Sequence, residues 1–309
     1  MVLLRYSWPA AIVFFTLLVL SSACNRSARE VVAYTSQDRI YAEPIFQEFT
    51  RRTGIKVNVL YDSEAAKTVG LANRLQAEKS HPQCDLFWNN EELRTWQLAA
   101  RGVLETNWAT LGYRSRRIVI NTNRLSLSSA PHSFFELTNR IWHGKVALAY
   151  PLFGTTATHF LALRQAWGDE PWQTWCRALQ ANKPFLVDGN SVVVNLVGRG
   201  EAWIGLTDSD DIAAGQSDGL TVTALPTQPD RMLIPNAIAL VVARRHPREA
   251  AELLAYLRGP EVAAKLVASH ALESADPPQT VPERLRISYL DLLRDLDAST
   301  RTLEKTFLK

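Results

Sequence analysis

The stretch WIGLTDSDD, residues 203–211, joins a short apolar segment to a cluster of acidic residues. We expect residues 203–206 to form a buried strand that ends where polar residues follow, namely Thr207, Asp208, Ser209, Asp210 and Asp211. Open α/β sheets bind ligands in the crevice beyond the carboxyl ends of their strands. Carboxylates this close together raise one another's pKa unless cations or hydrogen-bond donors lie among them. Two interpretations stay open: single acids that cap the next helix, or a ligand site made by the whole cluster, which we favour because of the rest of the chain.

Strands and helices alternate before this stretch. The hydrophobic pattern predicts strands at residues 31–35, 55–61 and 85–88, each followed by a helix, and a further strand at residues 117–121. This alternation is typical of a doubly wound α/β fold with a parallel sheet. The first three strands end in polar residues that we expect to meet at one edge of the sheet and to contact a ligand, namely Gln37, Asp38, Asp62, Asn90 and Glu91.

A second unit of the same kind begins after Pro131. We expect strands at residues 145–149, 184–187 and 221–225, and a strand at residues 237–243 that returns to the first unit. The chain is long enough for two domains. We therefore predict an α/β protein of two lobes, with residues 31–123 and 227–285 in lobe 1, residues 124–226 in lobe 2, and residues 286–309 in a C-terminal helical region.

Two glycine-containing segments stand at predicted helix N-termini in the second unit: GTT at residues 154–156 and GNS at residues 189–191. Unpaired backbone N–H groups and the helix dipole favour an anion at such positions. Neither segment has the Lys-Ser/Thr pair of a P-loop, so the sequence does not support nucleotide hydrolysis. We expect Thr155, Thr156, Asn190 and Ser191 to contact an anion, with plain helix capping as the alternative.

The N-terminal segment has the features of a signal peptide. Arg5 is the only charged side chain before Cys24, residues 8–20 are apolar, and small residues precede the cysteine. The apolar run is shorter than the ~20 residues of a spanning helix. We expect residues 1–23 to be removed, Cys24 to be lipidated, and residues 24–30 to form a tether on the periplasmic or cell-surface side of the membrane. Because Ser21 stands where a bacterial lipobox has a large aliphatic residue, an uncleaved anchor or a plain secreted form stays open.

Composition and missing motifs exclude several function classes. The chain of 309 residues carries a net charge of +3 and has no basic stripe with interleaved aromatic residues, so we expect no nucleic-acid partner. It has no HExxH, GxSxG or CxxC motif, and its six histidines are scattered, so we do not expect an enzyme. A sensor or scaffold role stays open. We expect Cys84 and Cys176 to be buried free thiols.

Five segments carry a resemblance to a known family. They are VVAYTSQDRIYAEPIFQEFTRRTGIKVNVLY (31–61), QCDLFWNNEELRTWQLAARGVLE (83–105), IWHGKVALAYPLFGT (141–155), AWIGLTDSDD (202–211) and EAAELLAYLRGPE (249–261). Together they resemble the bacterial extracellular solute-binding proteins of iron(III) ABC importers. The resemblance implies a periplasmic-binding-protein-like fold, with two α/β lobes joined by a two-pass hinge and a ligand cleft between them. It also implies a monomer that delivers its ligand to an ABC permease and its ATPase subunits.

The iron site that the resemblance implies is altered in this chain. Iron-binding members have a tyrosine pair where this chain has Asp210 and Asp211. They often have a histidine where it has Gln37 and Asp38, and a glutamate where Asn90 is in register and Glu91 is one position later. The anion positions are kept in kind as Thr155, Thr156, Asn190 and Ser191.

The altered site still predicts a bound cation. We expect the metal ligands to be Asp208, Asp210, Asp211 and Glu91. Carboxylates are hard oxygen donors that suit Ca²⁺, Mn²⁺ or Mg²⁺ as well as iron(III). The metal is then transported ligand and not a cofactor. The alternative is a small organic ligand such as a phosphonate, an amine or an amino acid.

Overall fold

The computed structural model describes residues 29–62, 68–226, 231–277 and 287–308. The predicted signal peptide and the predicted lipidation site, Cys24, lie outside the described residues. Within these four ranges, no helix is both long and apolar enough to cross a membrane.

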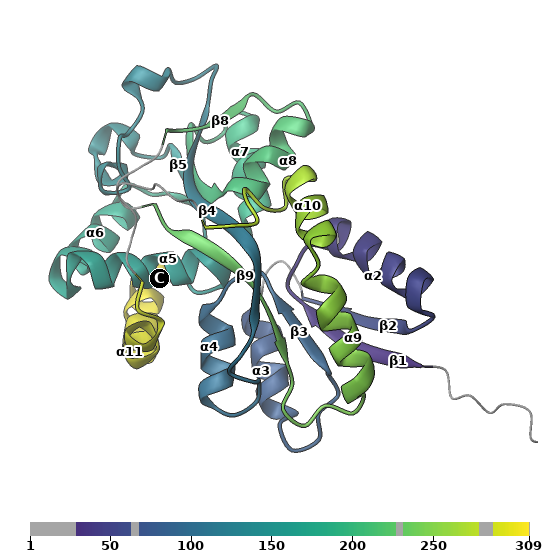
Figure 1. The fold of residues 1–309 in the computed structure, drawn as a ribbon. Helices are drawn as coiled ribbons and strands as arrows, with labels where there is room; N and C mark the ends of the chain where they lie inside the picture. The colour runs from purple at the N-terminus through teal and green to yellow at the C-terminus, as the bar shows by residue number, and fades with distance from the viewer. Residues whose placement is uncertain (1–28, 63–67, 227–230, 278–286, 309) are drawn as a thin grey trace, which may run out of the picture.

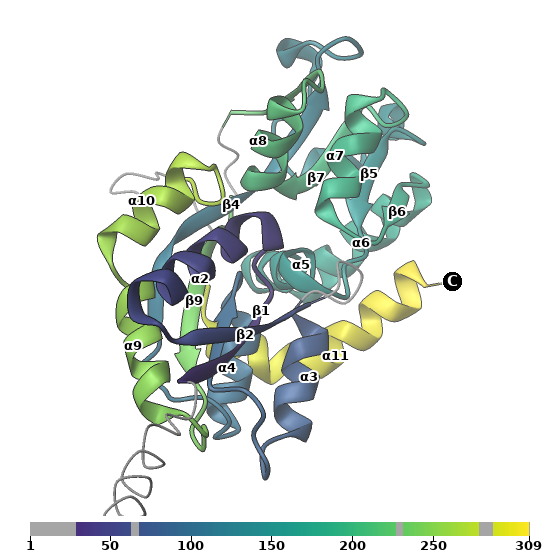
Figure 2. The ribbon, with the colours of Figure 1, turned by 90° about the vertical axis from the view of Figure 1, so that its right-hand side faces the viewer.

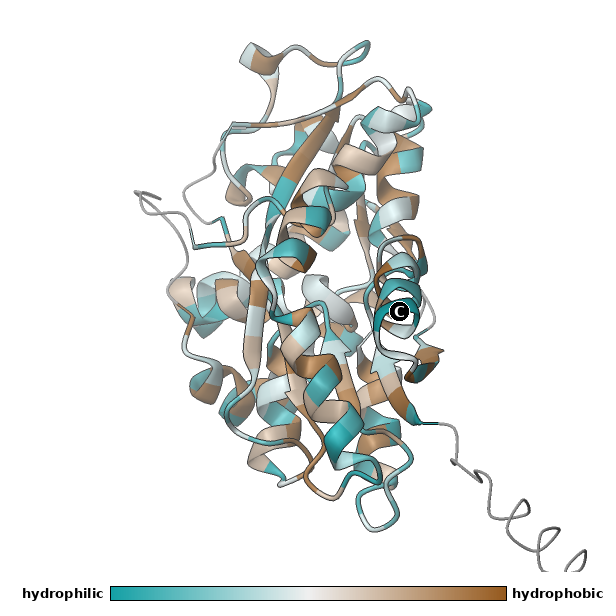
Figure 3. Ribbon diagram, turned by 45° about the vertical axis from the view of Figure 1, so that its right-hand side comes forward, coloured by the Kyte–Doolittle hydropathy of each residue, from teal (hydrophilic) through white to brown (hydrophobic). Residues whose placement is uncertain are grey.

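Lobe 1 is built on three parallel strands with one antiparallel strand beside them. β1 (Glu30–Thr35) lies between β2 (Lys56–Tyr61) and β3 (Leu86–Asn89), and β9 (Leu233–Leu240) runs antiparallel to β3. The helices of this lobe cover the sheet, as Figure 1 shows, and they are α2 (Arg39–Thr53), α3 (Val69–Ala77), α4 (Leu93–Ala100), α9 (Pro247–Leu257) and α10 (Pro260–Ala268). Their apolar sides pack on the sheet, and the strands are mostly brown in the hydropathy colouring of Figure 3.

Lobe 2 has a smaller sheet of its own. β5 (Val146–Ala149) is parallel to both β6 (Phe185–Val187) and β7 (Ile204–Asp208). The helices of this lobe are α5 (Gly154–Trp167), α6 (Asp169–Ala181), α7 (Asn190–Gly198) and α8 (Ser209–Ser217), and short 3-10 turns precede β5 at Leu127–Ser129, Phe135–Thr138 and Arg140–Trp142. Figure 2 shows this lobe above lobe 1.

One long strand joins the two lobes. β4 (Ala109–Asn121) pairs with β9 over its first half, and from Arg116 onward it pairs antiparallel with β7. β8 (Val222–Ala224) pairs with its end. The strand predicted at residues 117–121 is therefore too short. The predicted parallel order is confirmed for β1, β2 and β3, whereas β4 and β9 run antiparallel to their neighbours. Strand–helix alternation predicts parallel neighbours, but β4 and β9 cross between the lobes without a covering helix, so they can run antiparallel to their neighbours.

The opening stretch forms β7 and the start of α8. Ile204, Gly205 and Leu206 are buried in the centre of the lobe 2 sheet. A side chain at Gly205 would lie 2.6 Å from Val193 Cγ1 and 2.8 Å from Val119 Cγ1, so only glycine lets α7 pack this close to the strand. This close packing brings the N-terminus of α7 to the end of β7.

The C-terminal helix belongs to lobe 2 and touches lobe 1. α11 (Tyr289–Phe307) buries Leu292, Leu296, Leu303 and Phe307 in the core of lobe 2. At its start, the ring of Tyr289 stacks on Trp96 of α4 with a centroid distance of 6.0 Å. This helix lies within the predicted C-terminal region, whereas the lobe boundaries at residues 123 and 227 stay a prediction. Cys84 and Cys176 are buried free thiols, as predicted.

Candidate functional site

Asp208 is the central residue of the site. It is the last residue of β7 and precedes α8, but its carboxylate makes no capping bond to that helix. Its Oδ2 instead accepts the hydroxyl of Thr155 at 2.6 Å and the amide of Asn190 at 3.1 Å. The carboxylate therefore ties the end of β7 to the N-termini of α5 and α7, and it is 1% exposed.

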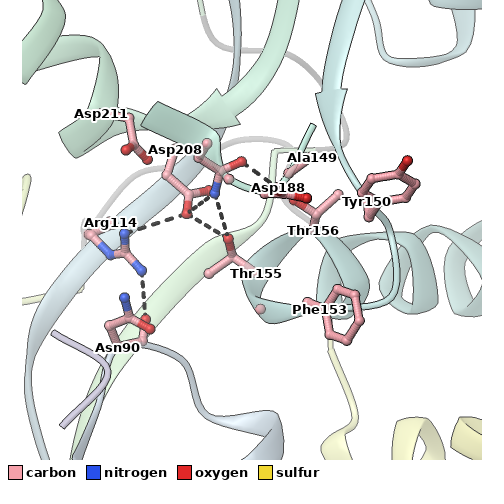
Figure 4. Close-up of a pocket in the computed structure, with 13 residues that line it drawn as sticks. Asn90, Arg114, Ala149, Tyr150, Phe153, Thr155, Thr156, Asp188, Asp208 and Asp211 are labelled. Carbon is pink, nitrogen blue, oxygen red and sulfur yellow. Dashed lines mark hydrogen bonds and ion pairs between the residues drawn. The ribbon is translucent and has the colours of Figure 1, made fainter. Parts of the chain in front are cut away.

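Two buried arginines of β4 neutralise this carboxylate. Arg116 lies opposite Asp208 in the strand register, and its Nη1 donates to Asp208 Oδ1 at 2.6 Å. Arg114, on the same face of the strand, donates from Nη1 to Asp210 Oδ2 at 2.7 Å and approaches Asp208 Oδ2 at 3.4 Å. Its Nη2 donates to the backbone oxygen of Asn90 in lobe 1 at 2.7 Å. Arg114 thus connects the two lobes through the acidic cluster (Figure 4).

The arginines decide the ionisation of Asp208. Burial alone would raise the pKa of Asp208, but the charges of Arg116 and Arg114, with the hydrogen bond from Thr155, hold it below its ordinary value. Burial likewise opposes the charge on Arg114, and the charges of Asp210 and Asp208 overcome it and raise the pKa of Arg114. Asp208 and Arg114 are therefore both charged at neutral pH.

A small cavity opens beside this network. It leaves about 30 Å³ for the centres of water-sized atoms. A space of this size is enough for ordered water or a metal ion. Its lining combines the acidic cluster with the two helix N-termini, namely Asn90, Arg114, Ala149, Tyr150, Phe153, Gly154, Thr155, Thr156, Asp188, Gly189, Asn190, Asp208 and Asp211.

Carboxylate oxygens gather next to this cavity. Asp208, Asp210 and Asp211 each offer one oxygen, and these oxygens lie within 4.8 Å of one another. Asp208 and Asp210 are buried, and Asp211 in the first turn of α8 is half-buried. The N-terminal residues of α5 and α7 line the same cavity as Asp211. The cavity therefore combines carboxylates with backbone N–H groups.

Not all of the predicted site residues line the cavity. Asn90, Thr155, Thr156, Asn190, Asp208 and Asp211 do, and Asp210 lies behind Arg114. Five others are not among the lining residues, namely Gln37, Asp38, Asp62, Glu91 and Ser191. Gln37 is buried and accepts a hydrogen bond from Asn236 at 2.8 Å, and the backbone oxygen of Asp38 accepts from the first turn of α2. Asp62 accepts from the backbone of Leu71, and Ser191 is exposed.

Glu91 has a structural role in this arrangement. Its carboxylate accepts the backbone N–H groups of Leu93 at 2.6 Å and Arg94 at 3.2 Å, at the start of α4. It also accepts the hydroxyl of Thr158 on α5 at 3.2 Å. Burial raises the pKa of Glu91, although the charge of Arg94 and these hydrogen bonds oppose the shift.

The variant Glu91→Gln is expected to flatten the pH dependence of stability. Because the pKa of Glu91 is raised in the folded protein, wild type loses unfolding free energy relative to the variant as pH rises above about 4.3. Urea unfolding at about pH 4 and about pH 7 measures this, and Glu304→Gln on the exposed face of α11 is the control. A difference between wild type and variant that is the same at both pH values would contradict it.

Three residues that shape the site were not predicted from the sequence. Arg114 and Arg116 lie on the same face of β4 as the buried residues Ile118 and Ile120. Two arginines on a face that is otherwise apolar could have indicated buried ion pairs. Tyr41 on α2 is the third residue. Burial, and then the charges of Asp210, Asp38 and Asp211, raise the pKa of Tyr41 to about 12. A phenol of lobe 1 therefore lies within electrostatic reach of the acidic cluster, and no sequence pattern indicated it.

Comparison with known families identifies the chain. The family model described as bacterial extracellular solute-binding protein matches residues 31–270. The chain belongs to this family. The match covers most of both lobes and all of the residues that line the cavity of this solute-binding protein.

Curated relatives and solved structures resemble this solute-binding protein. The major ferric iron-binding protein of Neisseria meningitidis is 25% identical over 201 residues, which are 58% of this chain and 59% of the relative. Iron-bound HitA from Pseudomonas aeruginosa has a TM-score of 0.76 at 18% identity, over 89% of this chain and 99% of that chain. AfuA from Actinobacillus pleuropneumoniae, with fructose-6-phosphate bound, has a TM-score of 0.72 at 16% identity, over 89% and 97%. These likenesses confirm the predicted two-lobe fold.

Proposed function

We propose that this protein is the substrate-binding component of an ABC importer and that it captures iron(III) or another hard metal ion together with an anion. The observation that carries the proposal is the set of three carboxylate oxygens within 4.8 Å of one another, from Asp208, Asp210 and Asp211. Oxygen donors of this kind suit hard cations. The ferric iron-binding relative of Neisseria supports iron as the metal.

The residues at the cavity divide into two roles in this proposal. Asp210 and Asp211 would coordinate the metal, with Asp208 beside them. Thr155, Thr156 and Asn190 would hold the anion at the helix N-termini of α5 and α7. Glu91 is left out of the metal site because its carboxylate already caps α4 and does not line the cavity. Asn90 and Arg114 line the side of the cavity that belongs to lobe 1 and the connecting strand.

The remaining parts of the proposal concern the whole protein. Residues 31–123 and 227–285 would move as one lobe against residues 124–226 and close over the cargo. The monomeric protein would be exported, held at the membrane through Cys24, and would deliver its cargo to a permease with its ATPase. It would carry out no chemical reaction, in keeping with its membership of a family of binding proteins.

Calorimetric titration tests the cargo. Chelator-treated protein is titrated with iron(III) citrate, Mn²⁺ and Ca²⁺, and elemental analysis of the purified protein identifies any metal that it retains. We expect binding well tighter than about 1 mM for at least one of them, which corresponds to about −4.1 kcal/mol. No binding tighter than this for any of the three metals would refute the proposal.

A small organic ligand is the second candidate. The observation that favours it is the wall of the cavity, where the guanidinium of Arg114 stands opposite Tyr150 and Phe153, so an anionic group and an apolar group could be held at opposite ends. The fructose-6-phosphate found in AfuA is a ligand of this type. A thermal-shift screen of amines, amino acids, phosphonates and sugar phosphates in the presence of chelator distinguishes the two candidates. A shift of the melting temperature without metal would favour the organic ligand.

A further inference from the structure

We propose that Arg114 determines the specificity of this site: its guanidinium already fills a cation position in the carboxylate cluster and keeps bare divalent metal ions out. This inference rests on the proposed function, because it concerns the same cavity. A cargo metal must therefore displace the guanidinium of Arg114 from the carboxylates before it can bind.

The contacts of Arg114 place its charge where a bridging metal would bind. Its Nη1 lies 2.7 Å from Asp210 Oδ2 and 3.4 Å from Asp208 Oδ2. Those carboxylates belong to the set whose oxygens lie within 4.8 Å of one another. Figure 4 shows the guanidinium between Asp208 and Asn90, with Asp211 to one side. A metal ion that bridges Asp208 and Asp210 would therefore compete with this guanidinium for the same oxygens.

The charge balance of the cluster explains why displacement matters. The guanidinium groups of Arg114 and Arg116 already offset charge on the carboxylates of Asp208 and Asp210. Asp188 also lines the cavity, but it is exposed at the mouth. A bare divalent ion that entered beside both arginines would be repelled by their charges, and this repulsion is strong in a site removed from water.

Arg114 can be displaced more readily than Arg116. Arg116 is 0% exposed, is not among the residues that line the cavity, and bonds to Asp208 at 2.6 Å, with further contacts to Asn190 and Thr155. Arg114 lines the cavity itself, so its guanidinium has space beside it. The Nε of Arg114, like that of Arg116, is buried without a hydrogen-bond partner among the described residues, so access to the cavity is what distinguishes the two guanidinium groups.

Removing the charge of Arg114 should open the site to metals. In Arg114→Gln, Asp210 loses its guanidinium partner, and we expect Mn²⁺ to bind at least about tenfold more tightly than it binds to wild type, a difference of about 1.4 kcal/mol. Isothermal titration calorimetry measures the ratio. Arg117→Gln is the matched control, since Arg117 lies on the same strand, is not among the residues that line the cavity, and pairs with Glu273. This control should bind Mn²⁺ as wild type does.

The titration separates this inference from the proposed function. If wild type binds no metal and Arg114→Gln binds Mn²⁺, the proposed cargo is wrong and the role of Arg114 stands. If wild type binds iron(III) and Arg114→Gln binds Mn²⁺ no more tightly than wild type does, the role of Arg114 is wrong and the function stands. No Mn²⁺ binding by either protein would also overturn the role.

A second measurement on wild type covers the case in which the variant does not fold. Protein with ¹⁵N-labelled arginine is titrated with gallium(III) citrate, a diamagnetic substitute for iron(III). We expect the side-chain signals of Arg114 to move and those of Arg116 to stay. Gallium that binds without moving the Arg114 signals would overturn the inference. No gallium response at all would refute iron(III) as the cargo. Where Arg114→Gln does not fold, this result would also overturn the inference, because no metal would then be shown to displace Arg114.

Discussion

Asp208→Asn is expected to lower the free energy of unfolding by about 3–5 kcal/mol at neutral pH, the usual cost of removing one partner from a buried ion pair. The substitution leaves Arg116, which is 0% exposed, without its carboxylate, and it takes one of two carboxylates from Arg114. Asparagine has nearly the same shape as aspartate, so the loss reports charge and not a cavity. Urea unfolding of the two proteins at neutral pH measures the difference.

The pH dependence of this difference has a definite sign. The pKa of Asp208 is held below its ordinary value in the folded protein, so its contribution to stability is present above about pH 4 and disappears as pH falls through the folded pKa. Wild type and Asp208→Asn should therefore converge in acid. Asp218→Asn, at the exposed end of α8, serves as the control and should change stability by less than about 0.5 kcal/mol. If Asp208→Asn lowers the free energy of unfolding by less than about 1 kcal/mol, the buried arginines do not need the charge of Asp208, and the prediction is wrong.

Asp211→Asn is expected to weaken metal binding. Asp211 is half-buried in the first turn of α8, lines the cavity and belongs to the carboxylate cluster. We expect at least about a tenfold loss of affinity for iron(III) citrate, equivalent to about 1.4 kcal/mol or more. Calorimetric titration measures the affinity, and urea unfolding checks that the variant is folded under the conditions of the titration.

Two further variants make the result for Asp211 specific. Asp218→Asn removes a carboxylate from the same helix at a distance from the cavity and should bind iron(III) citrate as wild type does. Glu91→Gln should also keep the affinity, because Glu91 caps α4 and does not line the cavity. If Glu91→Gln abolishes binding and Asp211→Asn does not, the assignment of the metal ligands is wrong.

The sequence predicted the parts of the fold that depend on local patterns. The strands at residues 31–35, 55–61 and 85–88 occur close to the predicted positions, as β1, β2 and β3, because their apolar residues follow the period of a strand. The stretch 203–211 forms the end of a central strand and the start of a helix, as expected. The antiparallel pairing of β4 and β9 was not predicted, because no local pattern shows that these two strands pass between the lobes.

The candidate site was predicted less completely than the fold. Asp208, Asp211, Thr155, Thr156 and Asn190 meet at one cavity, as the rule on strand ends suggests. Glu91 and Gln37 also follow a strand, but their side chains are used in other hydrogen bonds. Glu91 accepts from the backbone at the start of α4, and Gln37 accepts from Asn236 of β9. A position after a strand brings a residue near the edge of the sheet, and the neighbouring elements then decide where its side chain points.

The sequence by itself determined the family, the alternation of strands and helices, and the acidic character of residues 208–211, since each of these is written in residues close together in the chain. The tertiary structure alone decided that these acids are paired with arginines. Arg116 meets Asp208 only because β4 and β7 pair in one register, and a shift by one residue would turn both arginines to the other face of the sheet. The charge that a cargo meets in the cavity is therefore set by strand pairing between residues about ninety positions apart.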